Sequence, residues 1–436
     1  MGIVIMIGQV LLGLSLLIIL HELGHFLAAR AFGIKVEKFY LFFDAWGVKL
    51  FKFNYKGCEY GMGWLPLGGY VKIAGMIDES MDTEQLKGEP QPWEFRSKPA
   101  WQRLIVMMGG IIVNVLVGIV VFWMITFNYG STDIDNSKLY GIKPGIIGEK
   151  IGLNEGDKIL AVNGKEAKLF RQDLMSTEVL MGDAVLSVDR GGKRLEIKLP
   201  ADILNDVADY KKNEFVQPMF KMLPVIQVAP NTRASAMGLA VGDSIVALNG
   251  EAVTHLDQFK DLLVNNKGKE IKLDLIRNGK ELSLTAKGDT SSTLGFSNLP
   301  VIQRTYGLME SLPIGSSIAF SVITDNIKGF GKIFKGEVRA DKALSGPVGI
   351  ATMFGTEVDW FRFWSLVGML SMALAFMNML PIPALDGGHV IFLLIEMVQG
   401  KPLSEKFLEK AQVVGFFILI GLMIFVFGND IFKLVK

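Results

Sequence analysis

Four stretches of the chain carry no charged residue and are long enough to cross a lipid bilayer. They cover residues 2–20, 104–127, 363–380 and 411–428. A helix needs about 20 apolar residues to cross a hydrocarbon core about 30 Å thick. Buried helices of a soluble domain could explain the two stretches of eighteen residues, but a soluble core does not require four such stretches. The pattern therefore predicts four transmembrane helices.

The first apolar stretch differs from a secretory signal peptide. No basic residue precedes it, and its apolar run exceeds the usual length of about 7–15 residues. It continues directly into His21 and Glu22 and not into a cleavage site of small residues. We therefore expect a retained helix over about residues 2–30.

Basic residues gather in the segment between the first two stretches, which is typical of a cytoplasmic loop. Those close to the helix ends are Arg30, Lys35, Lys38, Arg96, Lys98 and Arg103. We expect residues 34–102 in the cytoplasm and residues 128–360 on the opposite side. Lys433 and Lys436 then lie on the outer side, against the rule, but the residues near the other helix ends outweigh them.

The long segment between the second and third stretches contains a repeat. The sequence IGLNEGDKILAVNG of residues 151–164 matches MGLAVGDSIVALNG of residues 237–250 at an offset of 86. A period of this length that occurs twice indicates two tandem domains and not a solenoid. In each copy Gly-Asp precedes a short apolar strand that ends in Asn-Gly, a dipeptide typical of a hairpin turn.

The second copy continues with a helical pattern over residues 254–265 and two strands over residues 270–286, joined at Asn278-Gly279. The pattern resembles the PDZ domain in its bacterial protease-associated form, present twice. PDZ domains bind extended peptides by strand addition, whereas copies with closed grooves would act only as spacers. A later apolar stripe predicts a helix over residues 312–334, lying on the membrane surface or packed against the repeat.

Charge and composition exclude several function classes. The 436 residues include 45 basic and 44 acidic side chains, and the net charge of +1 argues against a nucleic-acid partner. Cys58 is the only cysteine, which excludes a disulfide framework within the chain. With four histidines in total, any two that lie close together are informative.

Two of these histidines form an HExxH motif over residues 21–25. Positions i and i+4 share one face of a helix, so His21 and His25 can bind one metal ion with Glu22 beside them. The motif continues a membrane span, where an ionisable group costs about 2.5–3.5 kcal/mol at mid-depth. Two unrelated histidines would leave this cost uncompensated, whereas a metal site provides a compensating interaction.

Zinc in hydrolases usually has three protein ligands and a fourth position for water. Asp386 is the expected third ligand, because it follows the third apolar stretch at a point where two prolines break the helix and let the backbone turn inward. His389 and Glu396 are the competing candidates. His255, in the second repeat copy, has no expected role.

Together these features resemble the site-2 protease family of intramembrane zinc metalloproteases, and within it the branch of bacterial regulator of sigma-E proteases. The likeness covers nearly the whole chain. It rests on HExxH, on NxxPxPxLDG over residues 378–387, on the tandem copies between them, and on PLGGYVK (66–72) and SGPVG (345–349). HExxH alone recurs in many soluble proteases, but the combination is specific.

The resemblance implies that His21, His25 and Asp386 bind Zn2+ and that Glu22 is the general base. Zinc lowers the pKa of bound water towards ~7, and Glu22 would take the proton as the water attacks a peptide carbonyl. Asn378 would hold the substrate backbone through its side-chain amide. Its alternative role is a hydrogen bond between helices.

A transmembrane substrate must unwind before cleavage, because its backbone is hydrogen-bonded internally. Residues 36–41, 48–53 and 59–64 predict short strands, which the resemblance places in a membrane-embedded β-hairpin to which an extended substrate would add. Two segments depart from the family pattern. Phe42-Phe43-Asp44 replaces the common Gly-Phe-Gly, and residues 110–114 lack the usual proline after the glycine.

The expected fold is an α+β multi-domain membrane protein with about four transmembrane helices, a membrane-associated β-hairpin region and two tandem PDZ domains outside the membrane. The expected division is a first half of the protease core (1–127, with helices 2–30 and 104–127 and the hairpin region 36–75), PDZ domain 1 (128–215), PDZ domain 2 (216–290), a linker with the amphipathic helix (291–345), and the second half of the core (346–436, with helices 363–380 and 411–428).

The leading hypothesis is an intramembrane zinc endopeptidase of the inner (cytoplasmic) membrane, with the PDZ domains on the periplasmic side and the active site towards the cytoplasm. Its partners would be the lipid bilayer, peptides at the PDZ domains, and single-span membrane proteins such as trimmed anti-sigma factors or remnant signal peptides. A catalytically silent receptor is the alternative, but it would not need Glu22. An ion pathway is a third hypothesis, although no inverted repeat is evident in the spans.

Overall fold

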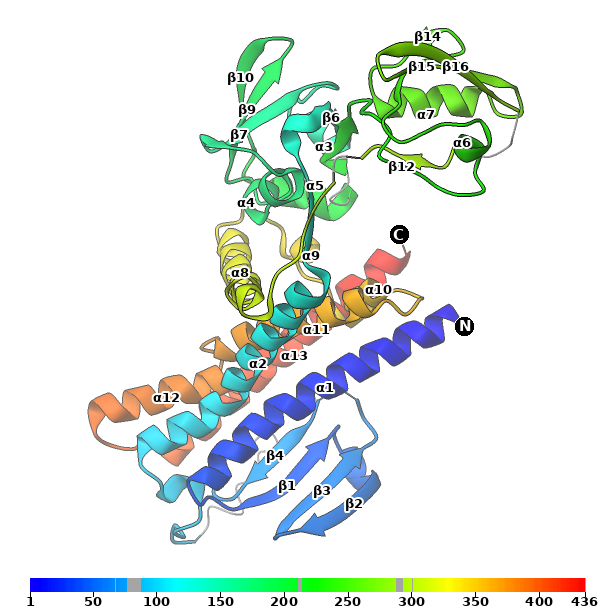
Figure 1. Ribbon diagram of the computed structural model, residues 1–436. Helices are drawn as coiled ribbons and strands as arrows, with labels where there is room; N and C mark the ends of the chain where they lie inside the picture. The colour runs from blue at the N-terminus through cyan, green and yellow to red at the C-terminus, as the bar shows by residue number, and fades with distance from the viewer. Residues whose placement is uncertain (67, 77–87, 211–213, 288–292, 300, 436) are drawn as a thin grey trace. The chain divides into compact units, whose positions relative to one another are not determined.

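The structure is a computed structural model that describes all residues except 67, 77–87, 211–213, 288–292, 300 and 436. The chain forms two compact units (Figure 1). The first contains residues 1–130, 305–331 and 344–436, and the second contains residues 131–304 and 332–343.

The first unit is mainly helical. Its helices are α1 (Gly2–Ala31), α2 (Ala100–Tyr129), α8 (Leu308–Phe334), α10 (Pro347–Phe354), α11 (Trp360–Met379), α12 (Asp386–Gln399) and α13 (Glu405–Val435). Four segments are long and apolar enough to cross a membrane, namely α1, α2, α11 and Lys406–Lys433 within α13. They contain the four predicted stretches, so the expectation of four candidate membrane helices is confirmed.

Helices α1 and α2 pack against each other through glycines. A Cβ atom added at Gly24 would lie 2.2 Å from the carbonyl oxygen of Gly109. On α2, a Cβ atom at Gly118 would lie 2.3 Å from the Met372 sulfur of α11. Small residues let membrane helices approach closely. Helix α2 therefore lies in direct contact with both α1 and α11.

The amphipathic helix α8 packs on membrane helices. Ala319 on its apolar face is buried with Phe122 of α2 and Met372 of α11. Near its start, the Leu308 carbonyl accepts a hydrogen bond of 2.7 Å from the Trp123 indole. The sequence left a membrane surface and the repeat as possible partners, and within the first unit the apolar stripe instead contacts α2 and α11.

A four-stranded sheet connects α1 to α2. Its strands are β1 (Val36–Leu41), β2 (Lys49–Tyr55), β3 (Cys58–Gly63) and β4 (Tyr70–Ile73), in the order β2-β3-β1-β4. β2 and β3 form the expected hairpin, while β1 pairs in parallel with β3 and antiparallel with β4. The sequence did not predict β4, and Leu67 of the PLGGYVK segment before it lies outside the described residues.

A polar network fixes the side chains across this sheet. The Tyr40 hydroxyl donates to Glu59 at 2.7 Å, and the Lys49 ammonium donates to the same carboxylate at 2.9 Å. These two donors, Lys49 above all, lower the pKa of Glu59 to about 2. Glu59 is therefore ionised at neutral pH and ties β3 to both neighbouring strands.

The second unit contains both repeat copies. Its strands are β5 (Ser131–Ile134), β6 (Leu139–Pro144), β7 (Lys158–Val162), β8 (Lys165–Glu166), β9 (Val185–Arg190), β10 (Lys193–Lys198), β11 (Val216–Phe220), β12 (Gln227–Val228), β13 (Ser244–Leu248), β14 (Glu251–Ala252), β15 (Ile271–Arg277), β16 (Lys280–Ala286), β17 (Phe296–Ser297) and β18 (Val301–Arg304). Its helices are α3 (Ile146–Lys150), α4 (Thr177–Leu180), α5 (Ile203–Tyr210), α6 (Arg233–Ala236), α7 (Leu256–Asn265) and α9 (Ala340–Ala343). The sheets β8-β7-β9-β10 and β14-β13-β15-β16 have the same order.

The repeated Gly-Asp and Asn-Gly motifs have the same structural roles in both copies. The aspartates of the Gly-Asp pairs are buried and bind an arginine on the third strand of each sheet, in the pairs Asp157–Arg190 and Asp243–Arg277. The asparagines have positive φ angles and accept a backbone hydrogen bond of 2.8 Å, in the pairs Asn163–Val185 and Asn249–Lys272. The motifs therefore recur because they hold the same sheet together.

The strand pairing modifies the expected boundary between the copies. Residues 216–220 were assigned to the second copy, but as β11 they pair with β6 of the first. The expected boundary at residue 290 lies outside the described residues. Residues 131–304 of this unit begin and end in the antiparallel pair β5–β18, in which Ser131 lies opposite Arg304.

Candidate metal centre

His21 and His25 lie one helical turn apart near the end of α1, so their imidazoles point to one side. Their Nε2 atoms are 3.3 Å apart. The Asp386 Oδ2 atom lies 3.3 Å from each of these two nitrogens. The three atoms thus form an equilateral triangle.

The backbone around Asp386 explains how a residue from the other half of the unit reaches the histidines. Helix α11 ends at Met379, and α12 begins at Asp386 after a turn in which Ala384 has a φ angle of 77°. A Cβ atom at Gly387 or Gly388 would lie 2.4 or 2.5 Å from a backbone oxygen of this turn. The two glycines let α12 begin directly against the turn, and this position brings Asp386 to α1.

The triangle has the size of a zinc site. Zinc binds histidine nitrogen and carboxylate oxygen at about 2.0–2.2 Å, so two ligands of a tetrahedral ion lie about 3.3–3.5 Å apart. The buried Asp386 Oδ2 atom has no hydrogen-bond partner among the described residues, and a metal ion would satisfy it. Across the described part of the chain, these three residues form the only group with metal-ligand geometry. They fit zinc and leave a fourth position for water.

Helix α2 holds both imidazoles from behind. The His25 Nδ1 atom lies 2.9 Å from the Val106 carbonyl oxygen, and the His21 Nδ1 atom lies 3.1 Å from the Asn114 amide nitrogen. A Cβ atom at Gly110 would lie 2.4 Å from atoms of both rings. A glycine is therefore required here for the imidazoles to occupy their positions.

Glu22 and Asn378 line a cavity beside the metal triangle. The Glu22 side chain lies beside Gly69 and the Val71 backbone at the start of β4. Asn378 on α11 has its amide nitrogen 3.3 Å from the His21 Nε2 atom. The cavity has a volume of about 300 Å³ and is lined by Leu14, Leu17, Ile18, His21, Glu22, Phe43, Pro66, Gly68, Gly69, Asn114, Leu374 and Asn378.

The other candidates for the third ligand lie elsewhere. Glu396 forms an ion pair with Arg103 of α2. His389 contacts the Phe392 ring and is not part of the metal triangle. His255 stacks on Tyr140 in the second unit.

Two features of the site were not assigned from the sequence. Asn114 is a polar residue within the second apolar stretch and received no role, and β4 was not predicted at all. A buried asparagine within a membrane span is a signal in itself, because it needs a partner. Its partner could not be named, since it comes from the packing of α2 on α1.

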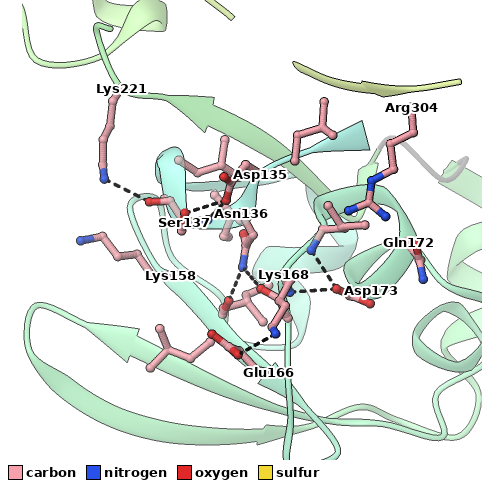
Figure 2. A pocket seen from close by; sticks show the side chains of 18 residues that line it. Asp135, Asn136, Ser137, Lys158, Glu166, Lys168, Gln172, Asp173, Lys221 and Arg304 are labelled. Carbon is pink, nitrogen blue, oxygen red and sulfur yellow. Dashed lines mark hydrogen bonds and ion pairs between the residues drawn. The ribbon is translucent and has the colours of Figure 1, made fainter. Parts of the chain in front are cut away.

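A second cavity lies in the other unit and has a volume of about 770 Å³. Figure 2 shows the charged side chains around it. Lys168 pairs with Glu166 at 3.6 Å, and the Asp173 carboxylate accepts two backbone hydrogen bonds of 2.8 Å. Among the described residues, none of those that line it belongs to a metal-binding group.

The model of Peptidase family M50 matches residues 9–422 of the chain. The chain belongs to this family. The M50 chain is 28% identical over 451 residues to the Regulator of sigma E protease of Haemophilus influenzae, with 98% of this chain and 99% of the relative covered. It is also 28% identical over 464 residues to the Regulator of sigma-E protease RseP of Escherichia coli, with 98% of each chain covered.

The family membership agrees with the geometry of the site. M50 peptidases are zinc-dependent, and the triangle of this chain has the ligand types and spacing that zinc requires. The protein is a zinc metalloprotease of the site-2 protease type, with four helices suited to a membrane.

Proposed function

We propose that this M50 protease cleaves the transmembrane segments of single-span membrane proteins during regulated intramembrane proteolysis. The substrates would be anti-sigma factors that a first protease has trimmed, or remnant signal peptides. The observation that carries the proposal is the position of the metal triangle, with two of its residues on a helix suited to cross the membrane. The names of the relatives, which denote regulators of sigma E, support the anti-sigma class.

His21, His25 and Asp386 would hold the ion. When bound, zinc would supply Lewis-acid activation of water and of the substrate carbonyl. Glu22, which lines the same cavity, would take a proton from the attacking water and deliver it to the leaving amine nitrogen. The Asn378 amide would donate a hydrogen bond to the substrate backbone, because it lies at the wall of the same cavity.

The edge strand β4 is the element suited to hold an unwound substrate. β4 pairs with β1 on one side, and Val71 of this strand faces Glu22. Gly68 and Gly69, just before it, line the cavity beside Glu22. An extended substrate would add to β4 and place its peptide bond beside Glu22.

The two repeat copies would be PDZ domains that bind peptide segments or exclude untrimmed substrates. The shared strand order and the cavity of the first copy support this role (Figure 2).

We place the protein in the inner membrane with residues 34–102 facing the cytoplasm. Lys56→Cys and Lys267→Cys, each made in a Cys58→Ser chain, test the orientation with a membrane-impermeant thiol reagent on spheroplasts. We expect labelling of position 267 alone. Labelling of position 56 alone would show that the protein has the opposite orientation in the membrane.

Glu22→Gln tests the catalytic proposal in liposomes with a trimmed single-span substrate. The variant is expected to bind zinc like the wild type and to lose cleavage by at least about 100-fold, since a general base contributes about 10²–10⁴-fold. Zinc in both proteins with cleavage in neither would favour the catalytically silent receptor. Equal cleavage by the wild type and the variant would show that Glu22 is not the general base.

A further inference from the structure

Asn114 is a fully buried amide in the middle of the apolar helix α2, and the proposed chemistry does not use it. Its Nδ2 atom lies 3.1 Å from the His21 Nδ1 atom. Its Oδ1 atom has no hydrogen-bond partner among the described residues. A buried polar atom without a partner costs about 1–3 kcal/mol, so this amide requires an explanation.

The metal site determines which ring nitrogen of each histidine carries the hydrogen. A neutral imidazole has one nitrogen with a hydrogen and one with a free lone pair, and only the latter can bind a metal. The Nε2 atoms of His21 and His25 form the triangle, so their Nδ1 atoms must carry the hydrogens. Each Nδ1–H group then needs an acceptor. For His25 the acceptor is the Val106 carbonyl oxygen.

His21 has only the Asn114 amide at its Nδ1 atom. If the Asn114 Nδ2 atom faces the ring, the His21 Nδ1 atom must accept its hydrogen bond. The His21 Nε2 atom then carries the ring hydrogen and cannot bind a metal. A half-turn of the amide exchanges its nitrogen and oxygen at almost the same positions. Oδ1 then accepts the Nδ1–H group of His21, and Nδ2 takes the position that Oδ1 leaves.

We propose that Asn114 is a positioning residue for the metal, which selects the metal-binding tautomer of His21 by accepting the Nδ1–H group through its side-chain oxygen. This inference rests on the metal site proposed above. The backbone supports the placement, since the Ser371 hydroxyl of α11 donates to the Asn114 carbonyl oxygen at 2.7 Å. The turn of α2 that carries the amide is therefore fixed against α11.

Three variants of the full-length protein in detergent test the proposal through zinc affinity, measured by competition with a chelator. Asn114→Leu keeps the size of the side chain but removes the acceptor, and it is expected to bind zinc 10–100-fold more weakly, the range for loss of a partner behind a metal ligand. Asn114→Asp retains an acceptor oxygen and is expected to stay within about threefold of the wild type. Thr126→Val is the matched control, because it removes a buried polar group of α2 whose hydrogen bond stays within that helix, at the Phe122 carbonyl oxygen.

Cobalt substitution gives a second readout, since the visible absorption of bound Co2+ reports the ligand geometry. The spectrum is expected to change in Asn114→Leu and to be preserved in Asn114→Asp and Thr126→Val. Wild-type zinc affinity in Asn114→Leu, or equal weakening by leucine and aspartate, would overturn the proposal. His21→Ala distinguishes an error in the metal site from an error in the role of Asn114. If His21→Ala binds zinc like the wild type, the metal site itself is wrong. If His21→Ala loses zinc and the Asn114 variants keep it, only the role of Asn114 is wrong.

Discussion

At the scale of the residue, the site depends on glycines as much as on its ligands. Gly110→Ala would place a methyl group 2.4 Å from atoms of His21 and His25, so that both rings must move. We expect zinc affinity to fall by about 100-fold, the upper end of the range for groups behind metal ligands. Gly8→Ala on α1 is the control, because its added Cβ atom meets nothing within 4 Å and alanine favours a helix. Equal zinc retention in both variants would contradict this account.

The grouping of the proposed site residues could be predicted from the sequence because its signals are local. His21, Glu22 and His25 lie within about one helical turn, and Asp386 follows a break in the helix that two prolines predict. The role of Asn114 could not be predicted in the same way. It depends on how closely α2 approaches α1, which the contact between Gly24 and Gly109 determines.

At the scale of the element, the two buried aspartate–arginine pairs make a comparative prediction. Asp243 is fully buried, whereas the Arg277 side chain is 34% exposed. Arg277→Gln would leave a buried carboxylate without its cation and is expected to cost the second copy about 3 kcal/mol, at the low end for a broken buried pair. Asp243→Asn should cost less, because water can reach the remaining guanidinium. Hydrogen exchange of the β13 and β15 amides would measure the loss of stability in both variants, with Lys280→Gln as the control.

The same pair gives a dependence on pH. Hydrogen bonds from Arg277 hold the pKa of Asp243 below its usual value of 3.8. A carboxylate whose pKa is lower in the folded state stabilises the fold above pH ~4, and this stabilisation is lost as the pH falls towards the folded pKa. The difference in the free energy of unfolding between the wild type and Arg277→Gln should therefore become smaller below pH ~4. A constant difference from pH 7 to pH 3 would contradict the assignment.

Elements with a strong local pattern were predicted well, and those that depend on distant partners were not. The apolar helices and the Asn-Gly turns, such as Asn278-Gly279 between β15 and β16, follow from composition and backbone preference. In contrast, β4 comes after two glycines that weaken any strand signal. The parallel pairing of β1 with β3 also joins strands that are not adjacent in sequence, and local patterns carry no information on such pairing.

At the scale of the whole molecule, residues 131–304, which make up most of the second unit, are an insertion between α2 and α8. Its two ends come together, because β5 and β18 pair with Ser131 opposite Arg304. Residues 131–304 can therefore be replaced by a short Gly-Ser linker that joins Gly130 to Thr305 without stretching the first unit. The metal triangle, Glu22 and Asn378 all belong to the first unit and would remain.

This excision tests whether the repeat copies restrict access to the site. If they exclude untrimmed substrates, the shortened protein should cleave an untrimmed single-span substrate at a rate close to that for the trimmed form, whereas the intact protein should prefer the trimmed form. Zinc content provides the control for the integrity of the remaining unit. If the shortened protein binds zinc and still cleaves only trimmed substrate, discrimination resides in the first unit. The strand β4 and the cavity beside Glu22 would then be the elements that select the substrate.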